Sequence, residues 1–198
     1  MAKALAHVAP EHDVLVTSDP GAIRAAARVV LPGQSAMPDC MKSLTEMGLL
    51  EVVVDAQHDR PFLGICLGMQ MLFAESEEGP TAGFGLVPGR VVRFRDDEMI
   101  GRGGERLKVP HMGWNRVHQT RPHRLWQGIP QDCRFYFAHS FHPVPDDPGL
   151  AAASTDYGIP FTCAIARANI FATQFHPEKS QRAGLQLLAN FVAWDGSA

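Results

Sequence analysis

The chain has 198 residues, 45% of them hydrophobic and 20% charged, which is enough to bury a core and is typical of one domain. Eighteen Lys and Arg against 21 Asp and Glu leave a formal net charge of -3, so no basic surface for nucleic acid is expected. The apolar runs fall far short of the roughly 18 to 20 residues that a membrane helix needs, and the N-terminus lacks the apolar segment of a signal peptide. We therefore expect a cytoplasmic protein without a membrane or nucleic-acid partner.

The first two thirds of the chain alternate β-rich and helical patterns. Strands are predicted at residues 13–17, 28–31 and 62–65, and helices at 23–27, 36–47 and 67–75. Residues 49–56 are ambiguous, because three consecutive valines favour a strand while their place before the next β-rich run favours a helix; we predict a helix. This alternation indicates an α/β fold with a parallel sheet.

From about residue 90 the chain is dominated by closely spaced β patterns. Strands are predicted at 90–94, 106–109, 115–118, 134–139, 151–154, 161–166 and 170–175, followed by a helix over 181–193. Short strands with hairpin-length connections are typical of mixed or antiparallel pairing. We therefore expect an antiparallel extension of the same sheet and not a second domain.

The four cysteines are widely spaced. Cys40, Cys66, Cys133 and Cys163 form no Cys-x-x-Cys pair, which argues against a zinc site, a redox motif or a disulfide framework. We predict no metal and no cofactor.

Cys66 lies in a glycine-flanked turn between a predicted strand and an apolar helical pattern. The sequence Gly64-Ile-Cys66-Leu-Gly68 matches the nucleophile elbow, with cysteine in place of serine. Glycines are required there because the strand folds back sharply into the helix. The helix N-terminus is expected to lower the pKa of the thiol. A lone cysteine is more often a packing residue, and the flanking glycines make the two interpretations about equally favoured.

A histidine and a glutamate follow the last predicted strand. His176 and Glu178 occur in the sequence Gln174-Phe-His-Pro-Glu, and Pro177 restricts the backbone beside the imidazole. A cysteine nucleophile needs an imidazole to transfer its proton and a carboxylate to orient that imidazole. The occurrence of both motifs, in the order Cys, His, Glu, favours a catalytic triad.

A third motif, Leu31-Pro-Gly33-Gln34-Ser35, directly follows the strand predicted at 28–31. Pro-Gly alone is more often an ordinary turn. In the functional interpretation the backbone amides of Gly33 and Gln34, together with the amide of Leu67, form an oxyanion hole.

Together these three motifs resemble those of the class I glutamine amidotransferases. The segments at 75–79, 110–115 and 176–180 (ESEEG, PHMGWN and HPEKS) are similar to one branch, the glutaminase subunits of imidazole glycerol phosphate synthase, and the resemblance extends over about residues 3–195. It implies a flavodoxin-like fold forming one domain over residues 1–198. The family begins with a hydrophobic strand and a Tyr-Gly-x-Gly-Asn turn, so the domain is expected to be N-terminally truncated, with its first strand missing. The family also usually has Gly at the position of Ser35.

The resemblance implies roles for the site residues. Cys66 would attack the side-chain amide of glutamine to give a thioester and ammonia, with His176 as base and acid and Glu178 as its orienter. Gln70 and Glu78 would hold the amino-acid end of glutamine. The substrate pocket would be completed by His139, Ser140 and Phe141.

The same resemblance implies a partner. Ammonia would pass to a HisF-type cyclase subunit, a (β/α)8 barrel, in a heterodimer that makes imidazole glycerol phosphate and aminoimidazole carboxamide ribotide for histidine biosynthesis. Trp114 and Lys179 would lie at the docking face.

Two alternatives remain open at this stage. One is another class I amidotransferase, such as the glutaminase of pyridoxal phosphate synthesis, although such a protein would lack the Pro-His-Met-Gly-Trp-Asn segment. The other is a catalytically impaired subunit that still docks on the cyclase, given Ser35 and the missing first strand.

Overall fold

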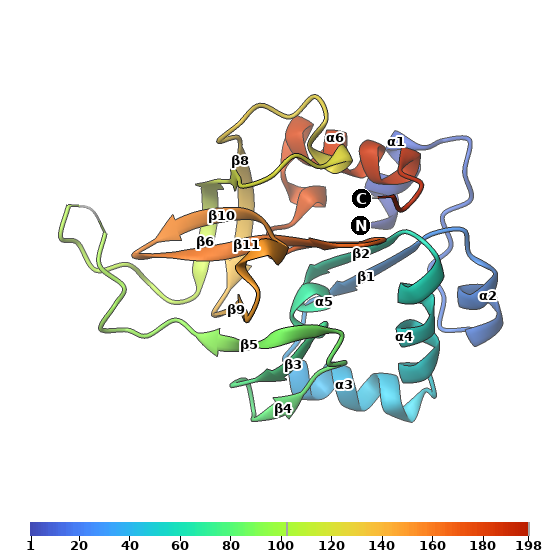
Figure 1. Ribbon diagram of the computed structural model, residues 1–198, viewed down its shortest axis with the longest axis horizontal. Helices are drawn as coiled ribbons and strands as arrows, with labels where there is room; N and C mark the ends of the chain where they lie inside the picture. The colour runs from blue at the N-terminus through green and yellow to red at the C-terminus, as the bar shows by residue number, and fades with distance from the viewer. Residues whose placement is uncertain (102, 198) are drawn as a thin grey trace.

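The computed structural model describes residues 1–101 and 103–197, and its centre is a six-stranded sheet (Figure 1). The strand order is β1 (Val29–Gly33), β2 (Phe62–Cys66), β12 (Ile170–Thr173), β11 (Ile159–Arg167), β10 (Ala151–Tyr157) and β7 (His118–Gln119). Strands β1, β2 and β12 are parallel, and the remaining pairs are antiparallel. The predicted parallel sheet with an antiparallel extension is confirmed.

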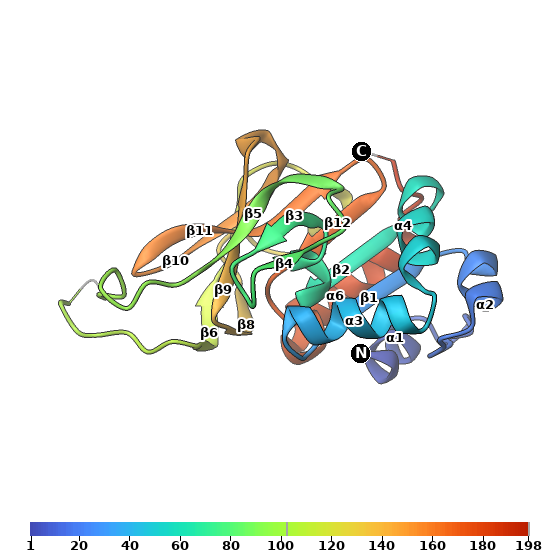
Figure 2. The ribbon, with the colours of Figure 1, turned by 90° about the horizontal axis from the view of Figure 1, so that it is seen from below.

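Helices cover both faces of this sheet. Helices α1 (Ala2–Val8) and α6 (Gln181–Ala193) pack together on one face, while α3 (Met37–Glu46) and α4 (Leu50–Asp59) lie on the other, with α2 (Pro20–Ala25) beside α4 (Figures 1 and 2). Short 3₁₀ helices span Arg124–Trp126, Pro148–Leu150 and Pro177–Lys179. The helix chosen for the ambiguous segment 49–56 and the C-terminal helix are both confirmed. None of the described helices is long and apolar enough to cross a membrane.

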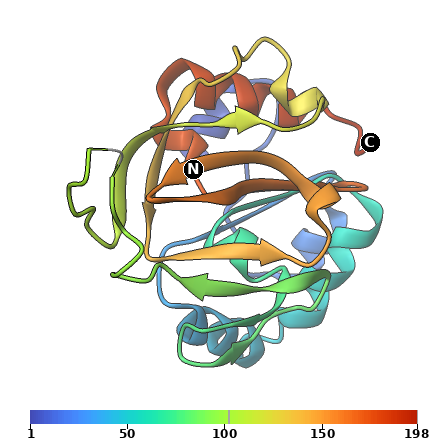
Figure 3. The same ribbon diagram turned by 60° about the vertical axis from the view of Figure 1, so that its left-hand side comes forward.

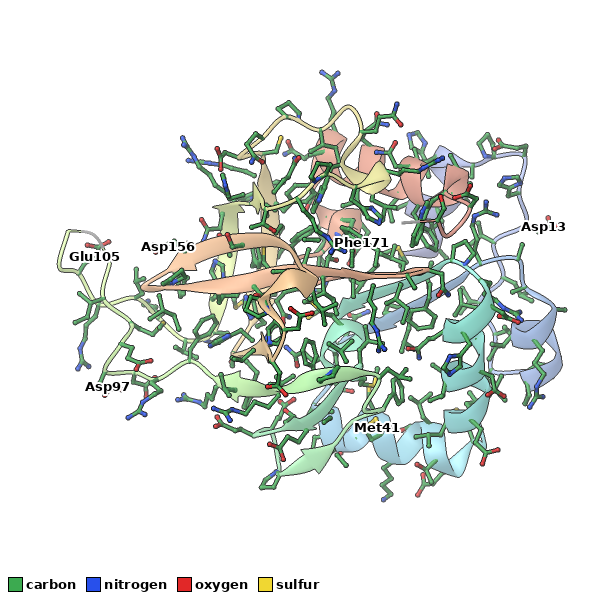
Figure 4. All side chains as sticks on the ribbon, in the orientation of Figure 1. Asp13, Met41, Asp97, Glu105, Asp156 and Phe171 are labelled. Atoms are coloured by element: carbon green, nitrogen blue, oxygen red, sulfur yellow. The ribbon has the colours of Figure 1, made fainter. Side chains whose placement is uncertain are left out.

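The parallel strands are buried on both faces, and alternate residues belong to different cores. Leu63 and Phe171 pack with Leu187, Leu188 and Phe191 of α6, and Figure 4 shows Phe171 inside the molecule. The intervening residues Phe62, Ile170 and Ala172 pack with Val53 of α4 on the opposite face. A fully buried Leu or Phe contributes about 1.5–3 kcal/mol, so both helical layers hold the sheet that carries Cys66.

The other strands form two smaller sheets and do not join the central one. Strands β4 (Thr81–Ala82), β3 (Phe73–Ser76), β5 (Val87–Arg93) and β9 (Phe141–Pro145) form one sheet, while β6 (His111–Arg116) pairs with β8 (Arg134–His139) (Figure 3). The predicted antiparallel extension is therefore confirmed for β7, β10 and β11, but the strands predicted at 90–94 and 134–139 belong to the smaller sheets. Phe73, Val87 and Val91 share a buried cluster with Ile165 of β11, so packing against the face of the sheet, and not pairing at its edge, buries them.

Two predicted strands are absent. Residues 13–17 form no strand, and Leu15 and Val16 are 69% and 82% exposed; Figure 4 places Asp13 at the outer surface. Among the described residues no other strand pairs with this segment, and a strand without a ladder partner leaves its amides and carbonyls unpaired. Residues 106–109 make only one isolated bridge, between Arg106 and Ile100.

Candidate active site

Cys66 is the last residue of β2 and sits at a strained turn. Its φ of 54° and ψ of -110° lie in a region that non-glycine residues rarely adopt. A Cβ on Gly64 would lie 2.8 Å from the carbonyl oxygen of Gly68, and one on Gly68 would overlap the carbonyl oxygen of Leu31. The glycine requirement of the elbow therefore has a steric cause, which is the close approach of α5 to β1 and β2.

The helix after the elbow is much shorter than predicted. Helix α5 spans only Leu67–Gln70, and the chain then forms β3 from Phe73 to Ser76, so the prediction of a helix over 67–75 is wrong in its second half. The apolar residues Met71, Leu72 and Phe73 are buried, and burial explains them without a helix. One turn supplies only a weak dipole, but its first amides, including that of Leu67, have no partner within the helix.

His176 follows β12 and is held in place through its backbone. Its amide donates to the carbonyl oxygen of Tyr136 on β8 at 2.9 Å. The Ser180 hydroxyl donates to the carbonyl oxygen of His176 at 2.6 Å and accepts from the amide of Tyr136 at 3.0 Å. These bonds tie the loop after β12 to β8 and fix the backbone position from which the imidazole of His176 extends.

The imidazole lies between the thiol and a carboxylate. Nδ1 of His176 is 2.9 Å from Oε1 of Glu178, and the Cys66 side chain is the other group that acts to raise the pKa of the ring. Burial by itself lowers the pKa of His176, but the interactions with Cys66 and Glu178 outweigh it and raise that pKa to about 9. Burial likewise works to raise the pKa of Glu178, but the bond to His176 outweighs it and the pKa is lowered. At neutral pH the geometry therefore favours an imidazolium between two acceptors.

Cys66 and His176 open into a cavity of about 340 Å³. The predicted oxyanion and substrate residues that line it are Gly33, Gln34, Leu67, Gln70, Glu78, His139, Ser140 and Phe141. Lys179 also lines the cavity, whereas Glu178 supports His176 from behind and Trp114 lies outside. Sites predicted from four separate stretches of sequence are thus brought together.

Two of the predicted substrate residues already have protein partners. Nε2 of Gln70 donates to the carbonyl oxygen of Phe141 at 3.0 Å and to Oε1 of Gln174 at 2.9 Å. Oε2 of Glu78 accepts from the amide of Met37 at 2.9 Å, at the start of α3. Glutamine bound at these groups has to replace or share these bonds.

Sequence reasoning assigned no role to Gln174. This residue is fully buried, and its Nε2 lies 3.6 Å from Sγ of Cys66. Its position near the end of the predicted strand 170–175, two residues before His176, was the available indication.

The oxyanion loop packs tightly against the elbow. A Cβ on Gly33 would lie 2.6 Å from Cβ of Leu67, so glycine allows the loop to approach the helix start. Positive φ angles occur at four described non-glycine residues, and Ser35 is not one of them. Ser35 therefore causes no backbone strain in this conformation, and its hydroxyl lies 3.2 Å from Sγ of Cys40.

Exposed aromatic and basic side chains lie beside the cavity. Trp114 is 42% exposed, and its ring contacts that of Tyr136 edge-on with 6.1 Å between centroids. Nζ of Lys179 lies 5.8 Å from the centroid of the same tyrosine ring. Met112, on the same face of β6 as Trp114, is 64% exposed. We call these four residues, Met112, Trp114, Tyr136 and Lys179, the rim cluster.

Within the described residues no group of His, Cys, Asp and Glu has the arrangement of a metal site.

The family model of the class-I glutamine amidotransferases matches residues 13–194. The chain belongs to this family. It is 61% identical over 194 residues to the imidazole glycerol phosphate synthase subunit HisH of Aromatoleum aromaticum and 56% identical to that of Nitrosomonas europaea, covering 98% of this chain and 92% of each relative. The predicted resemblance is thereby confirmed.

Solved structures support the predicted fold. A glutamine amidotransferase superposes with a TM-score of 0.68 at 14% identity, over 96% of this chain and 92% of that one. The glutaminase domain of Trypanosoma brucei CTPS, solved with bound acivicin, gives a TM-score of 0.61 at 15% identity over 98% and 87%. At these identities the likeness concerns the fold alone.

Proposed function

We propose that this chain hydrolyses glutamine through a Cys66–His176–Glu178 triad and forms one amidotransferase domain. The observation that carries the proposal is the triad geometry: a strained, buried cysteine faces an imidazole whose pKa is raised by a thiol and a carboxylate, at the floor of a cavity. Sγ of Cys66 attacks the amide carbon of glutamine, and His176 delivers a proton to the departing nitrogen. The carbon–nitrogen bond breaks, ammonia leaves, and water then hydrolyses the γ-glutamyl thioester to glutamate with His176 as base.

The surrounding groups fit this reaction. Gly33, Gln34 and Leu67 line the cavity beside Cys66, and we propose that their backbone amides stabilise the tetrahedral oxyanion. The carboxylate of Glu78 suits the substrate ammonium. Gln70 and the backbone of Ser140 and Phe141 offer polar atoms to the α-carboxylate end.

The relatives support a subunit role. Each is named a subunit of imidazole glycerol phosphate synthase, and we propose that this chain likewise passes ammonia to a HisF-type cyclase barrel in a heterodimer. The rim cluster supports the docking side, since Trp, Tyr and Met are enriched at interface centres. The partner's ligand would accept the ammonia to give imidazole glycerol phosphate and aminoimidazole carboxamide ribotide.

The test is covalent labelling with a glutamine-like chloroketone or diazoketone, read by mass spectrometry, with glutamate release measured in parallel. We expect modification at Cys66, protection by glutamine, and loss of glutamate release in Cys66→Ser. Cys163 is fully buried and serves as an internal control. Labelling at Cys40 or Cys133 in place of Cys66, or full activity of Cys66→Ser, would contradict the proposal.

A further inference from the structure

Two histidines outside the triad are buried side by side near the cavity. His111 of β6 and His139 of β8 are opposite each other in the antiparallel ribbon and are only 2% and 6% exposed. Nδ1 of His111 lies 3.0 Å from Nε2 of His139. The ring of His111 also stacks between those of Phe137 and Tyr157, at centroid distances of 4.7 and 3.9 Å. Two polar rings in an aromatic environment are costly to bury unless their nitrogens are bonded.

The partners of this pair determine which nitrogen carries each proton. Nδ1 of His139 lies 2.7 Å from the carbonyl oxygen of Phe141, and a carbonyl only accepts, so Nδ1 is protonated. Burial lowers the pKa of His139 well below its usual value and that of His111 to about 4, so both rings are neutral at pH 7. Nε2 of His139 is then an acceptor, and Nδ1 of His111 must donate to it.

These hydrogen bonds form a series, and the side-chain amide of Asn115 completes it at its outer end. Its Nδ2 lies 3.4 Å from Nε2 of His111 and 2.8 Å from the carbonyl oxygen of Asp156. Because Nε2 of His111 is unprotonated, the amide donates to it. The hydrogen bonds therefore run in one direction, from Asn115 to His111 to His139 to the carbonyl of Phe141.

The carbonyl of Phe141 joins this series to the catalytic cysteine. It also accepts from Nε2 of Gln70 at 3.0 Å, and the same Nε2 donates to Gln174 at 2.9 Å. Nε2 of Gln174 lies 3.6 Å from Sγ of Cys66. His139, Phe141, Gln70 and Cys66 all line the cavity, so a shift of the imidazole pair displaces groups that contact glutamine.

We propose that Asn115, His111 and His139 are positioning residues that set the affinity for glutamine by fixing the Phe141 carbonyl and, through it, the Gln70 side chain. The proposal rests on the glutaminase activity proposed above. None of the three has to touch the reacting atoms; their effect is on the pocket wall. Interactions of this kind act on substrate and transition state alike, so their loss raises KM more than it lowers kcat.

The first test is independent of activity. ¹⁵N NMR of the full chain with labelled histidine reports the tautomer of each neutral ring, with His111 and His139 assigned by their substitution. We expect both in the Nδ1–H form at pH 7, whereas an unperturbed histidine prefers the Nε2–H form. Finding His139 in the Nε2–H form overturns the proposal, whether or not the chain hydrolyses glutamine.

The second test separates KM from kcat in glutamine hydrolysis by the full chain with its cyclase partner. His111→Phe keeps a stacked ring and removes the donor, and we expect KM to rise about tenfold with kcat changed less than threefold. His111→Asn places an amide where Nδ1 was and should restore most of the affinity. The milder Asn115→Ala removes only the half-buried outer donor, and we expect a threefold rise in KM if His111→Phe fails to fold.

His142→Phe is the matched control. His142 is as buried as His139, and its ring packs on that of Phe94 at a centroid distance of 4.7 Å. The Phe94 ring also contacts those of His111 and His139, but His142 makes no hydrogen bond to the series. We expect its KM to be unchanged. The proposal is overturned if folded His111→Phe or Asn115→Ala keeps the wild-type KM, or if KM rises equally in His142→Phe. An inactive wild-type chain overturns the glutaminase proposal instead and leaves the NMR test standing.

Discussion

In the proposed reaction, Glu178 acts through the proton of His176. Its carboxylate bonds Nδ1 at 2.9 Å and contributes both a hydrogen bond and a charge that raise the pKa of the imidazole to about 9. Burial works in the opposite direction. Removing the carboxylate charge therefore lowers the pKa of His176, and the imidazolium that protonates the departing ammonia is lost at a lower pH.

We predict that Glu178→Gln shifts the basic limb of the pH profile of kcat/KM to lower pH and reduces the plateau by roughly 10⁴-fold, as for other triads that lose their carboxylate. The measurement is glutamate release from pH 6 to 10 in the presence of the cyclase. Glu75→Gln, at an exposed position of β3 outside the cavity, is the control. A basic limb that stays in place in Glu178→Gln would show that the carboxylate does not set this pKa.

Ser180 holds the same imidazole in position through hydrogen bonds to backbone groups. Its buried hydroxyl bonds both the carbonyl of His176 and the amide of Tyr136. Ser180→Ala leaves the amide of Tyr136 unpaired and removes one of the two donors to the carbonyl of His176, the other being the amide of Lys179, so we expect a loss of about 1–3 kcal/mol in the free energy of unfolding. We also expect a lower kcat, because the ring loses its anchor. Chemical denaturation and kinetics on the same variant test both effects, and an unchanged denaturation midpoint would contradict the first.

At the scale of elements, the elbow depends on close contact between β1, β2 and α5. A side chain at Gly68 would overlap the carbonyl oxygen of Leu31, which is backbone and has little freedom to move. We predict that Gly68→Ala destabilises the protein by about 1–3 kcal/mol and abolishes labelling of Cys66.

Gly21→Ala is the matched control for that substitution. Gly21 lies in the first turn of α2, and the nearest atom to an added Cβ there is 3.5 Å away. Alanine favours a helix relative to glycine, so we expect equal or slightly higher stability by thermal unfolding. A fully stable and reactive Gly68→Ala would mean that the elbow can relax around a methyl group.

The elements that could be predicted from sequence are those whose pattern and burial agree. Helix α6 has a regular apolar stripe and was predicted at the bounds observed, and β2 is an unbroken apolar run that ends at Cys66. The residues of the proposed triad could be picked out from the sequence because each lies within a short local motif at or just after a strand end.

Elements that depend on distant partners were not predictable. The segment 13–17 has a strand pattern but no described strand beside it, and 71–73 is apolar because the start of β3 packs under the central sheet. Gln174 and His111 are polar residues whose contacts are with residues 108 and 28 positions away in sequence, respectively. No local pattern encodes those contacts.

On the scale of the whole molecule, hydrogen bonds between protein atoms hold the groups that line the cavity. Both Gln70 and Glu78 are engaged with protein atoms, and the Glu78 bond to the amide of Met37 joins the substrate pocket to the start of α3, directly after the oxyanion loop. A ligand that favours an open arrangement must offset these bonds. Contacts of a partner with the rim cluster, which adjoins the cavity through Lys179 and Met112, can supply that free energy.

We therefore predict that the isolated chain hydrolyses glutamine slowly and that a HisF-type cyclase carrying its ligand accelerates it by at least tenfold. Trp114→Ala should weaken the complex about tenfold or more, since a large exposed aromatic at an interface centre is commonly worth more than 1 kcal/mol. The measurements are glutamate release and calorimetric Kd with and without the cyclase. Met47→Ala, an equally exposed apolar residue just after the far end of α3, should leave both unchanged. Full glutaminase activity of the purified chain alone would contradict the first expectation, and wild-type affinity of Trp114→Ala would remove the rim cluster from the docking face.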